Sequence, residues 1–343
     1  MDLTNFNPSS LAHPLDIGQA ANQWAASQVF VDYRSRKAQN TLTRQGNDLA
    51  LFAKCLADVG IEVGDLATDS TAWSVITWGL VEGFKRWQLE AGYSVSSVNV
   101  RLSTIKTYAK LALKAGTLDK SEYALIRAVS GYDGKEARRI NEQRRAVDLP
   151  TRFERSGAKK ADNTAITRQQ ADSLKAQPNT AQGRRDCLLM CLLLDHGLRC
   201  GEVALLKVED FDLEAGEFKF YRPKVDKTQT HRMTPDTLTA ARAYLTQDAG
   251  EVGPLLLASR KGGELTHAGM TERAITKRVG ALGNAIGIDR LSAHDLRHYW
   301  ATQAARNGTP IDRLQDAGGW NSPAMPLRYV ERAKIANEGV LLG

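Results

Sequence analysis

The stretch Ser292-Ala-His-Asp-Leu-Arg-His298 decides the interpretation of the C-terminal half of this chain. Ser292 followed by Asp295 three residues later is a capping-box pattern, which predicts the start of a helix. Unpaired backbone N–H groups and the positive end of the helix dipole favour an anion such as phosphate at that start. His294 and Arg297 are three residues apart, so both lie on one face of the helix. A proton-transfer group and a planar cation therefore point to the same place.

A solvated basic helix face that contains a histidine explains this stretch equally well when it is taken alone. The composition indicates what kind of partner to expect. The chain has 343 residues, enough for two domains with their own cores, and a formal net charge of +7, which favours a polyanionic partner. No apolar run approaches the roughly 20 residues that cross a bilayer, and the N-terminus lacks a basic region followed by an apolar one. We therefore expect a soluble cytoplasmic protein with no membrane partner.

The cysteines predict neither a metal centre nor a disulfide framework. The sequence contains four of them and no Cys-x-x-Cys pair. Cys187 and Cys191 lie four residues apart in an apolar run, where buried packing is the simpler explanation. All four are expected to be reduced thiols.

The N-terminal part predicts a short lead-in followed by a helical bundle. Residues 1–24 carry scattered Pro, Ser and Asn, which is typical of a poorly ordered or loosely docked segment. Residues 25–134 repeat apolar side chains at steps of three and four, the period of amphipathic helices. The third predicted helix, which runs up to Gly116, carries basic residues that suit a phosphate backbone or form an ordinary solvated face. These residues are Arg101, Lys106, Lys110 and Lys114.

A basic connector is predicted between the two halves, over residues 135–163. Apolar residues become rare there, and Pro150 and Gly157 break any helix. The connector either lies along DNA or is a solvated flexible tether. Its basic residues are Arg138, Arg139, Arg144, Arg145, Arg152, Arg155, Lys159 and Lys160.

Residues 164–343 predict a mixed α+β domain, so the whole chain is expected to be mainly α with one small hairpin or sheet. Thr167-Arg-Gln-Gln170 starts a helix, and the apolar segment Asp186–His196 predicts a buried one. Arg199 follows that buried helix directly and is therefore held rigidly, with Glu202 on the same face of the next helical start.

The sequence then changes to a period of two. Segments 217–222 and 230–233 predict the strands of a hairpin with Lys224 and Lys227 near its tip. Beyond Arg297, a short helix ends at Gly318-Gly319, and Ser322-Pro323 starts another that carries Tyr329. The tail from Val340 to Leu342 is apolar enough to dock onto another surface.

Five elements in this order make the chain resemble the tyrosine recombinase, or phage integrase, family. They are Arg199, the hairpin lysine, His294-Asp-Leu-Arg297, Trp320 and Tyr329, the last nine residues after the tryptophan. His-x-x-Arg alone is a weak motif, but the ordered set is specific. The resemblance spans the whole chain in architecture, with a helical core-DNA-binding domain ahead of a catalytic domain, and is strongest from Thr167 to Arg332.

The resemblance implies a role for each matching residue. Arg199 and Arg297 match the two arginines that hold the scissile phosphate, and Tyr329 matches the nucleophile of a 3′-phosphotyrosine intermediate. His294 matches the proton-transfer group, which suits the chemistry because a free phenol with a pKa of about 10 is a poor nucleophile. Glu202 matches an acidic position that supports the arginines.

Two positions need separate comment. Lys224 is the better match to the lysine that protonates the leaving 5′ oxygen, with Lys227 as the alternative. Trp320 stands where many family members have histidine and some have tryptophan; its indole N–H still donates one hydrogen bond to phosphate but transfers no proton. Activity is expected to survive this departure.

The resemblance further implies a double-stranded DNA substrate, a tetramer on two DNA duplexes, and no metal or other cofactor. Three alternatives remain: a type IB topoisomerase or telomere resolvase, a DNA-binding regulator that has lost activity, and a metal-dependent nuclease. The complete residue set disfavours the regulator, and the lack of clustered carboxylates disfavours the nuclease. The target sequence, the direction of the reaction (integration, excision, dimer resolution or transposition), the need for accessory proteins and the oligomeric state off DNA stay open.

Overall fold

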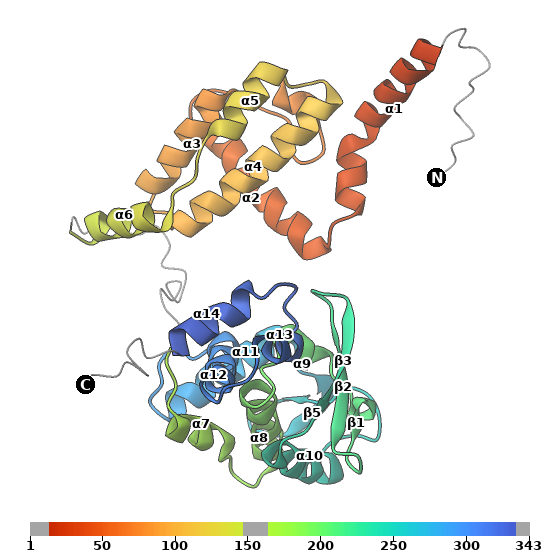
Figure 1. Ribbon diagram of the computed structural model, residues 1–343, viewed down its shortest axis with the longest axis vertical. Helices are drawn as coiled ribbons and strands as arrows, with labels where there is room; N and C mark the ends of the chain where they lie inside the picture. Colours follow the sequence, from red (N-terminus) through yellow and green to blue (C-terminus); the bar gives the residue numbers. More distant parts are fainter. Residues whose placement is uncertain (1–13, 147–163, 334–343) are drawn as a thin grey trace, which may run out of the picture. The chain divides into compact units, whose positions relative to one another are not determined.

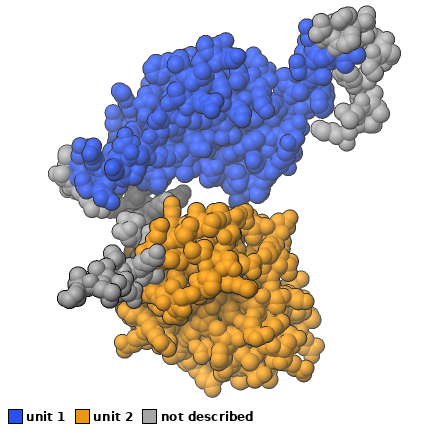
Figure 2. Space-filling view, viewed as in Figure 1, with its two compact units in different colours: residues 1–158 blue, residues 159–343 orange. Residues whose placement is uncertain are grey.

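The computed structural model describes residues 14–146 and 164–333. The chain divides into two compact units, residues 1–158 and residues 159–343 (Figure 2). Each unit has an apolar core of its own. Within the described ranges, no helix combines the length and apolarity needed to cross a membrane.

The described part of the first unit is helical (Figure 1). Helix α4 packs against α1, α2, α3 and α5, and its inward residues Val98, Ile105 and Tyr108 are fully buried. Ser94 begins α4 by accepting a hydrogen bond from the Ser97 amide, and Gly116 ends it in the left-handed conformation (φ 77°). The elements are α1 (Pro14–Ser35), α2 (Gln39–Ala57), η3 (Thr71–Trp73), α3 (Trp78–Glu90), α4 (Val95–Ala115), α5 (Lys120–Ala128) and α6 (Gly134–Ala146).

Two segments of this unit differ from the sequence prediction. Helix α1 begins at Pro14, inside the expected lead-in, because proline is favoured in a first helical turn. Side chains such as Trp24 are exposed there, so the segment has little buried stripe to reveal the helix. The start of the expected connector is also helical: the Asp133 carboxylate accepts from the amides of Lys135 and Glu136 and so caps α6. Pro150, Gly157 and the basic residues from Arg152 to Lys160 lie outside the described residues.

The described part of the second unit, residues 164–333, combines helices with two small antiparallel sheets, which confirms the predicted mixed fold. Helix α8 lies at its centre and packs against α7, α10 and α12, with Leu188 to Leu194 buried. The helices are α7 (Arg168–Lys175), α8 (Ala181–Leu194), α9 (Cys200–Leu205), η4 (Val208–Asp210), α10 (Pro235–Gln247), α11 (Glu272–Ala285), α12 (Ala293–Arg306), α13 (Ile311–Gly318) and α14 (Ala324–Ala333). The strands are β1 (Phe211–Asp212), β2 (Glu217–Arg222), β3 (Lys227–Arg232), β4 (Leu257–Ser259) and β5 (Leu265–Gly269).

The β2–β3 hairpin is tighter than the sequence predicted. Its register pairs Glu217 with Arg232 and Arg222 with Lys227, so Lys227 belongs to a strand and Lys224 to the turn. The short turn needs one residue with positive φ, and Asp226 adopts it at 48°. The prediction that β3 begins at Thr230 was therefore wrong, because the polar run before it pairs along the whole of β2.

Candidate active site

Ser292 is the N-cap of helix α12, as the sequence predicted. Asp295 completes the capping box by accepting from the Ser292 amide at 2.8 Å and the Ser292 hydroxyl at 2.6 Å. The other carboxylate oxygen of Asp295 accepts from the Thr164 amide at 2.9 Å. This bond attaches the first described residue of the second unit to the start of α12. His294 and Arg297 follow in the first two turns of α12.

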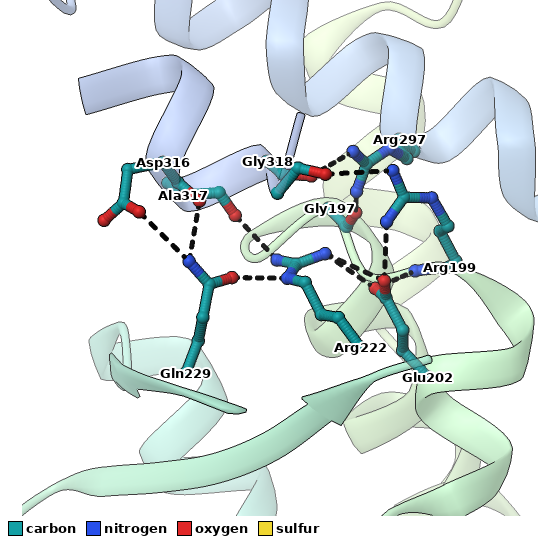
Figure 3. Close-up of polar contacts among 10 residues, drawn as sticks. Gly197, Arg199, Glu202, Arg222, Gln229, Arg297, Asp316, Ala317 and Gly318 are labelled. Carbon is teal, nitrogen blue, oxygen red and sulfur yellow. Dashed lines mark hydrogen bonds and ion pairs between the residues drawn. The ribbon is translucent and has the colours of Figure 1, made fainter. Parts of the chain in front are cut away.

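Arg297 is a buried cation whose geometry is set by backbone carbonyls. Its side chain is 3% exposed, and its guanidinium donates to the carbonyls of Gly197 and Gly318 (Figure 3). The guanidinium also lies 4.6 Å from the centre of the Trp320 ring. Burial lowers the pKa of Arg297, and the positive charge of Arg199 lowers it further. The planar guanidinium of Arg297 is thus held in one orientation, at a place where water screens its charge little.

Arg199 is held by two hydrogen bonds to Glu202. The carboxylate accepts from Arg199 Nη1 at 2.6 Å and from the Arg199 backbone amide at 2.8 Å. The Nη2 group of Arg199 also donates to the Gly319 carbonyl at 3.5 Å. Arg199 immediately precedes α9, so its position is set by the end of the buried α8 and the start of the next helix.

The predicted basic residues converge on one cavity of about 500 Å³. It is lined by Arg199 directly before α9, by His294 and Arg297 on α12, and by Lys224 in the hairpin turn. The start of α12 lines it as well and adds the positive end of a helix dipole. The remaining lining residues are Cys200, Gly201, Glu202, Leu205, Pro223, Glu272, Thr276, Ser292 and Ala293. The three cations Arg199, Arg297 and Lys224 outnumber the two lining carboxylates, Glu202 and Glu272, so the cavity suits an anion with several oxygens, such as a phosphodiester.

Tyr329 is close to this cavity but does not line it among the described residues. Its side chain is 2% exposed in α14, which packs against α12 and α13. The ring centre lies 5.6 Å from that of Trp320 and 5.2 Å from that of His298. The structure thus brings the predicted nucleophile beside the site in a covered position.

Trp320 connects the arginines to the end of α13. It follows Gly319, which ends the helix in the left-handed conformation (φ 59°). The indole packs against both Arg297 and Trp300, with ring centres of the two tryptophans 6.2 Å apart. A Cβ on Gly318 would come within 2.0 Å of the Trp320 ring, so this close packing requires glycine.

The sequence interpretation missed two residues of this cluster, Arg222 and His298. His298 Nε2 lies 3.0 Å from His294 Nε2, so one imidazole donates and the other accepts. The signal was present, since His298 is four residues after His294 on the same helix face. Arg222 is completely buried, and its signal was its place in the inward row of β2 with Phe218 and Phe220.

The two candidate lysines occupy different environments. Lys224 lines the cavity, whereas Lys227 Nζ forms an exposed ion pair with Asp316 Oδ1 at 2.6 Å. Lys227 is directly opposite Arg222 in the hairpin register. Lys224 therefore has the more direct approach to an anion in the cavity.

In the first unit, the predicted DNA-contact residues divide into two groups. Lys106 and Lys110 line a surface hollow of about 410 Å³ beside Asn99 and Ser103, and Arg138 and Arg139 are exposed on α6. Burial lowers the pKa of Lys106, and Lys85 nearby lowers it further.

Arg101 and Arg144 form the second group, in which the cation has partners inside the unit. Arg101 contacts Gln88 Oε1 at 3.1 Å and lies over the Tyr93 ring, whereas Arg144 donates to the Tyr93 carbonyl at 2.8 Å. Both help to hold the helices together. The side chain of Arg145 and the tail from Val340 to Leu342 lie outside the described residues.

The chain belongs to the phage integrase family, whose model matches residues 164–335. This matched region contains the whole cavity and Tyr329. The family resemblance predicted from the ordered motif is therefore confirmed.

Two curated relatives each match about half of this chain. A probable integrase/recombinase of Methanocaldococcus jannaschii is 30% identical over 155 residues, which are 44% of this chain and 47% of the relative. Tyrosine recombinase XerD of Neisseria meningitidis serogroup B is 30% identical over 184 residues, or 52% of this chain and 62% of the relative. The chain thus spans about half to three-fifths of the lengths of these relatives.

A solved structure extends the similarity of fold to both units. It is a lambda integrase tetramer bound to a Holliday junction, with a TM-score of 0.59 and 14% sequence identity. The match covers 92% of this chain and 79% of that one.

Proposed function

We propose that the protein is a site-specific DNA recombinase that cuts and rejoins DNA strands through a 3′-phosphotyrosine at Tyr329, without a metal ion. The observation that carries the proposal is the convergence of Arg199, Arg297, His294 and Lys224 on one cavity beside Tyr329. Membership of the phage integrase family supports it.

The chemistry follows from phosphoryl transfer. The Tyr329 oxygen attacks phosphorus and loses its proton, the bond to the 5′ oxygen breaks, and that oxygen takes up a proton. Negative charge on the two non-bridging oxygens is stabilised by the guanidinium forks of Arg199 and Arg297. The phosphotyrosine conserves the energy of the broken bond, so a second 5′ hydroxyl restores the diester without a nucleotide cofactor.

His294 is the proposed proton acceptor for the attack. Burial lowers its pKa from the usual value, and the nearby charges of Arg297, Arg199 and Lys224 lower it further, against an opposing effect of Asp295. The imidazole is therefore neutral at neutral pH and can accept a proton. His298 lies between His294 and Tyr329 and is the proposed link between them.

Tyr329 must reach the phosphate for this reaction to occur. Because its side chain is covered by Trp320 and His298, we propose that DNA binding shifts α14 and turns the hydroxyl into the cavity. Among the described elements, α14 contacts only α12 and α13 extensively, so a shift of α14 would disrupt its packing against these two helices alone.

We propose double-stranded DNA as the partner and a tetramer on two duplexes as the working assembly, with the apolar tail docking into a neighbouring copy. The lambda integrase structure is a tetramer on a Holliday junction, which supports this arrangement. The hollow with Lys106 and Lys110 offers the first unit a phosphate contact. The proposed location of the reaction is the cytoplasm.

A strand-exchange assay tests the proposed function. The protein is mixed in chelator with two differently labelled duplexes carrying the DNA that flanks its gene, and joint molecules are measured. A recombinase joins strands of the two duplexes. Relaxation of supercoiled DNA without joint molecules would instead indicate a topoisomerase, and binding without strand breakage would indicate a regulator. Activity that disappears in chelator would favour a metal-dependent nuclease.

The two lysines make a direct prediction. If Lys224 protonates the leaving oxygen, Lys224→Ala lowers the cleavage rate about 10²-fold or more, because general acid catalysis contributes about 10²–10⁴-fold. A substrate with sulfur in place of the bridging 5′ oxygen restores the rate, since a thiolate leaves without protonation. Lys227→Ala is the matched control and should show neither effect. The opposite pattern would assign the acid to Lys227.

The lowered pKa of His294 predicts the acid side of the pH profile. The neutral imidazole is the active form, so the cleavage rate at protein concentrations well below saturation, which reports the free protein, should be constant above about pH 6.5 and fall as the pH drops through the lowered pKa. Single-turnover rates measured from pH 5 to 8 check this. A decline centred above 6.5, or an unchanged decline in His294→Ala, would contradict the assignment.

A further inference from the structure

Arg222 is the only arginine in the described β2–β3 hairpin whose side chain is completely buried. It ends β2 in the inward row that begins with Phe218 and Phe220, and its guanidinium lies 4.6 Å from the centre of the Phe220 ring. Burial lowers its pKa, while Glu202 opposes that effect. A cation in such a place is tolerated only where its hydrogen bonds are made.

All the bonds of Arg222 lead to the elements that hold the two cavity arginines (Figure 3). Its Nη1 donates to both oxygens of Glu202, at 2.9 and 2.8 Å. Its Nη2 donates to the Ala317 carbonyl at 2.7 Å, and its Nε donates to Gln229 Oε1. Gln229 in turn donates to the Asp316 carbonyl at 2.8 Å. The guanidinium therefore joins the hairpin to α9 and to the end of α13.

Each of these connections continues to an arginine of the cavity. Glu202 holds both the side chain and the backbone amide of Arg199. The residues after Ala317 are Gly318 and Gly319, whose carbonyls accept from Arg297 and Arg199. A Cβ on Gly319 would come within 2.6 Å of Arg222 Cδ, so the chain passes directly over the guanidinium.

The sharing of Glu202 has an electrostatic consequence. One carboxylate between two guanidinium groups leaves a net charge of +1, so Arg199 keeps positive charge for an anion in the cavity. Without Arg222, the buried carboxylate would pair with Arg199 alone and neutralise it. The Glu202 carboxylate lies 2.6 to 2.9 Å from both guanidinium groups, and opposite charges this close interact strongly where burial excludes water.

We propose that Arg222 is a positioning residue of the phosphoryl-transfer site: it divides the charge of Glu202 and aligns Arg199 and the α13 end on the scissile phosphate. This inference rests on the proposed function. Arg222 does not line the cavity among the described residues and acts through its neighbours. Its effect therefore belongs to the reaction of bound DNA rather than to DNA affinity.

The experiment measures single-turnover formation of the covalent adduct at saturating protein. Arg222→Met should lower this rate about 10–100-fold, by analogy with residues that orient metal ligands, while the DNA dissociation constant changes little. Adding Glu202→Gln to Arg222→Met should restore part of the rate, because the carboxylate that neutralises Arg199 is gone. Arg222→Lys keeps the charge without the planar fork and should be intermediate.

A methylphosphonate at the scissile position separates positioning from a merely structural role. This substrate lacks one charged oxygen, so wild type and Arg222→Met should react with it at similar rates. The matched control is Arg185→Met, which removes another buried arginine, paired with Asp186 at 2.7 Å. Any loss in that control should be equal on both substrates.

Two results would overturn the inference. One is an equal loss of rate by Arg222→Met on the diester and the methylphosphonate, which would make its role structural. The other is no restoration by Glu202→Gln in a double variant whose circular dichroism shows it folded. Absence of any adduct with wild-type protein is a different failure, since it would remove the proposed function itself.

Discussion

Replacing Tyr329 by phenylalanine is expected to abolish covalent attachment to DNA while leaving the fold and DNA binding intact. The substitution removes only the hydroxyl, and the ring keeps its packing against Trp320 and His298. The expected loss is at least about 10⁴-fold, in line with the loss of other enzymatic nucleophiles. Denaturing gels of protein mixed with labelled, nicked substrate measure the adduct.

Tyr299→Phe is a suitable control for this variant. Tyr299 is on α12 and partly buried, yet it does not line the cavity among the described residues. Its loss should leave the adduct unchanged. An adduct that persists in Tyr329→Phe would mean that another residue is the nucleophile.

Replacing Arg297 by alanine is expected to lower the cleavage rate about 10²–10³-fold, the usual cost of removing one preorganised donor to a developing charge. Its guanidinium is held by the carbonyls of Gly197 and Gly318, so it reaches the phosphate without reorganisation. Removing it also leaves these buried carbonyls without a donor, and the melting temperature should fall. Single-turnover cleavage and thermal unfolding measure the two effects.

Arg297→Lys distinguishes charge from geometry. Lysine keeps the positive charge but cannot donate to two carbonyls and a phosphate with one planar fork. We expect it to recover less than a tenth of the lost rate. Full recovery would show that Arg297 supplies charge alone, and cleavage unaffected by Arg297→Ala would remove it from the site.

The local signals in the sequence predicted much of the site because they act over short distances. The capping box at Ser292 places His294 and Arg297 by helix geometry alone. Glu202 three residues after Arg199 predicts their contact in the same way. The order of the motifs identified the family, and with it the convergence of residues 98 positions apart in the chain, such as Arg199 and Arg297.

Contacts between residues far apart in the sequence could not be predicted from such local signals. Arg222 interacts with Ala317 across 95 positions, and nothing near Arg222 in sequence indicates that partner. The position of Lys227 in a strand depends on the register of a polar hairpin, which weak alternation does not specify. Tyr329 lies on a predicted helix, but its covered state depends on packing against Trp320.

The rival account of a DNA-binding regulator makes a different prediction for the same residues. A regulator needs positive charge for affinity, but it needs neither a neutral histidine nor a buried tyrosine beside the arginines. In such a protein, substitution of Tyr329 and His294 would leave all measurable activity unchanged. The arrangement of both residues beside Arg297 favours the enzyme.

Mass spectrometry of the trapped adduct tests the central claim most directly. Wild-type protein is reacted with nicked substrate in chelator, the DNA is digested to a short remnant, and the protein is cleaved with trypsin. We predict a nucleotide remnant on the peptide Tyr329-Val-Glu-Arg332, attached to the tyrosine through a 3′ phosphate. A remnant on another of the nine tyrosines, or on any other residue type, would contradict the account.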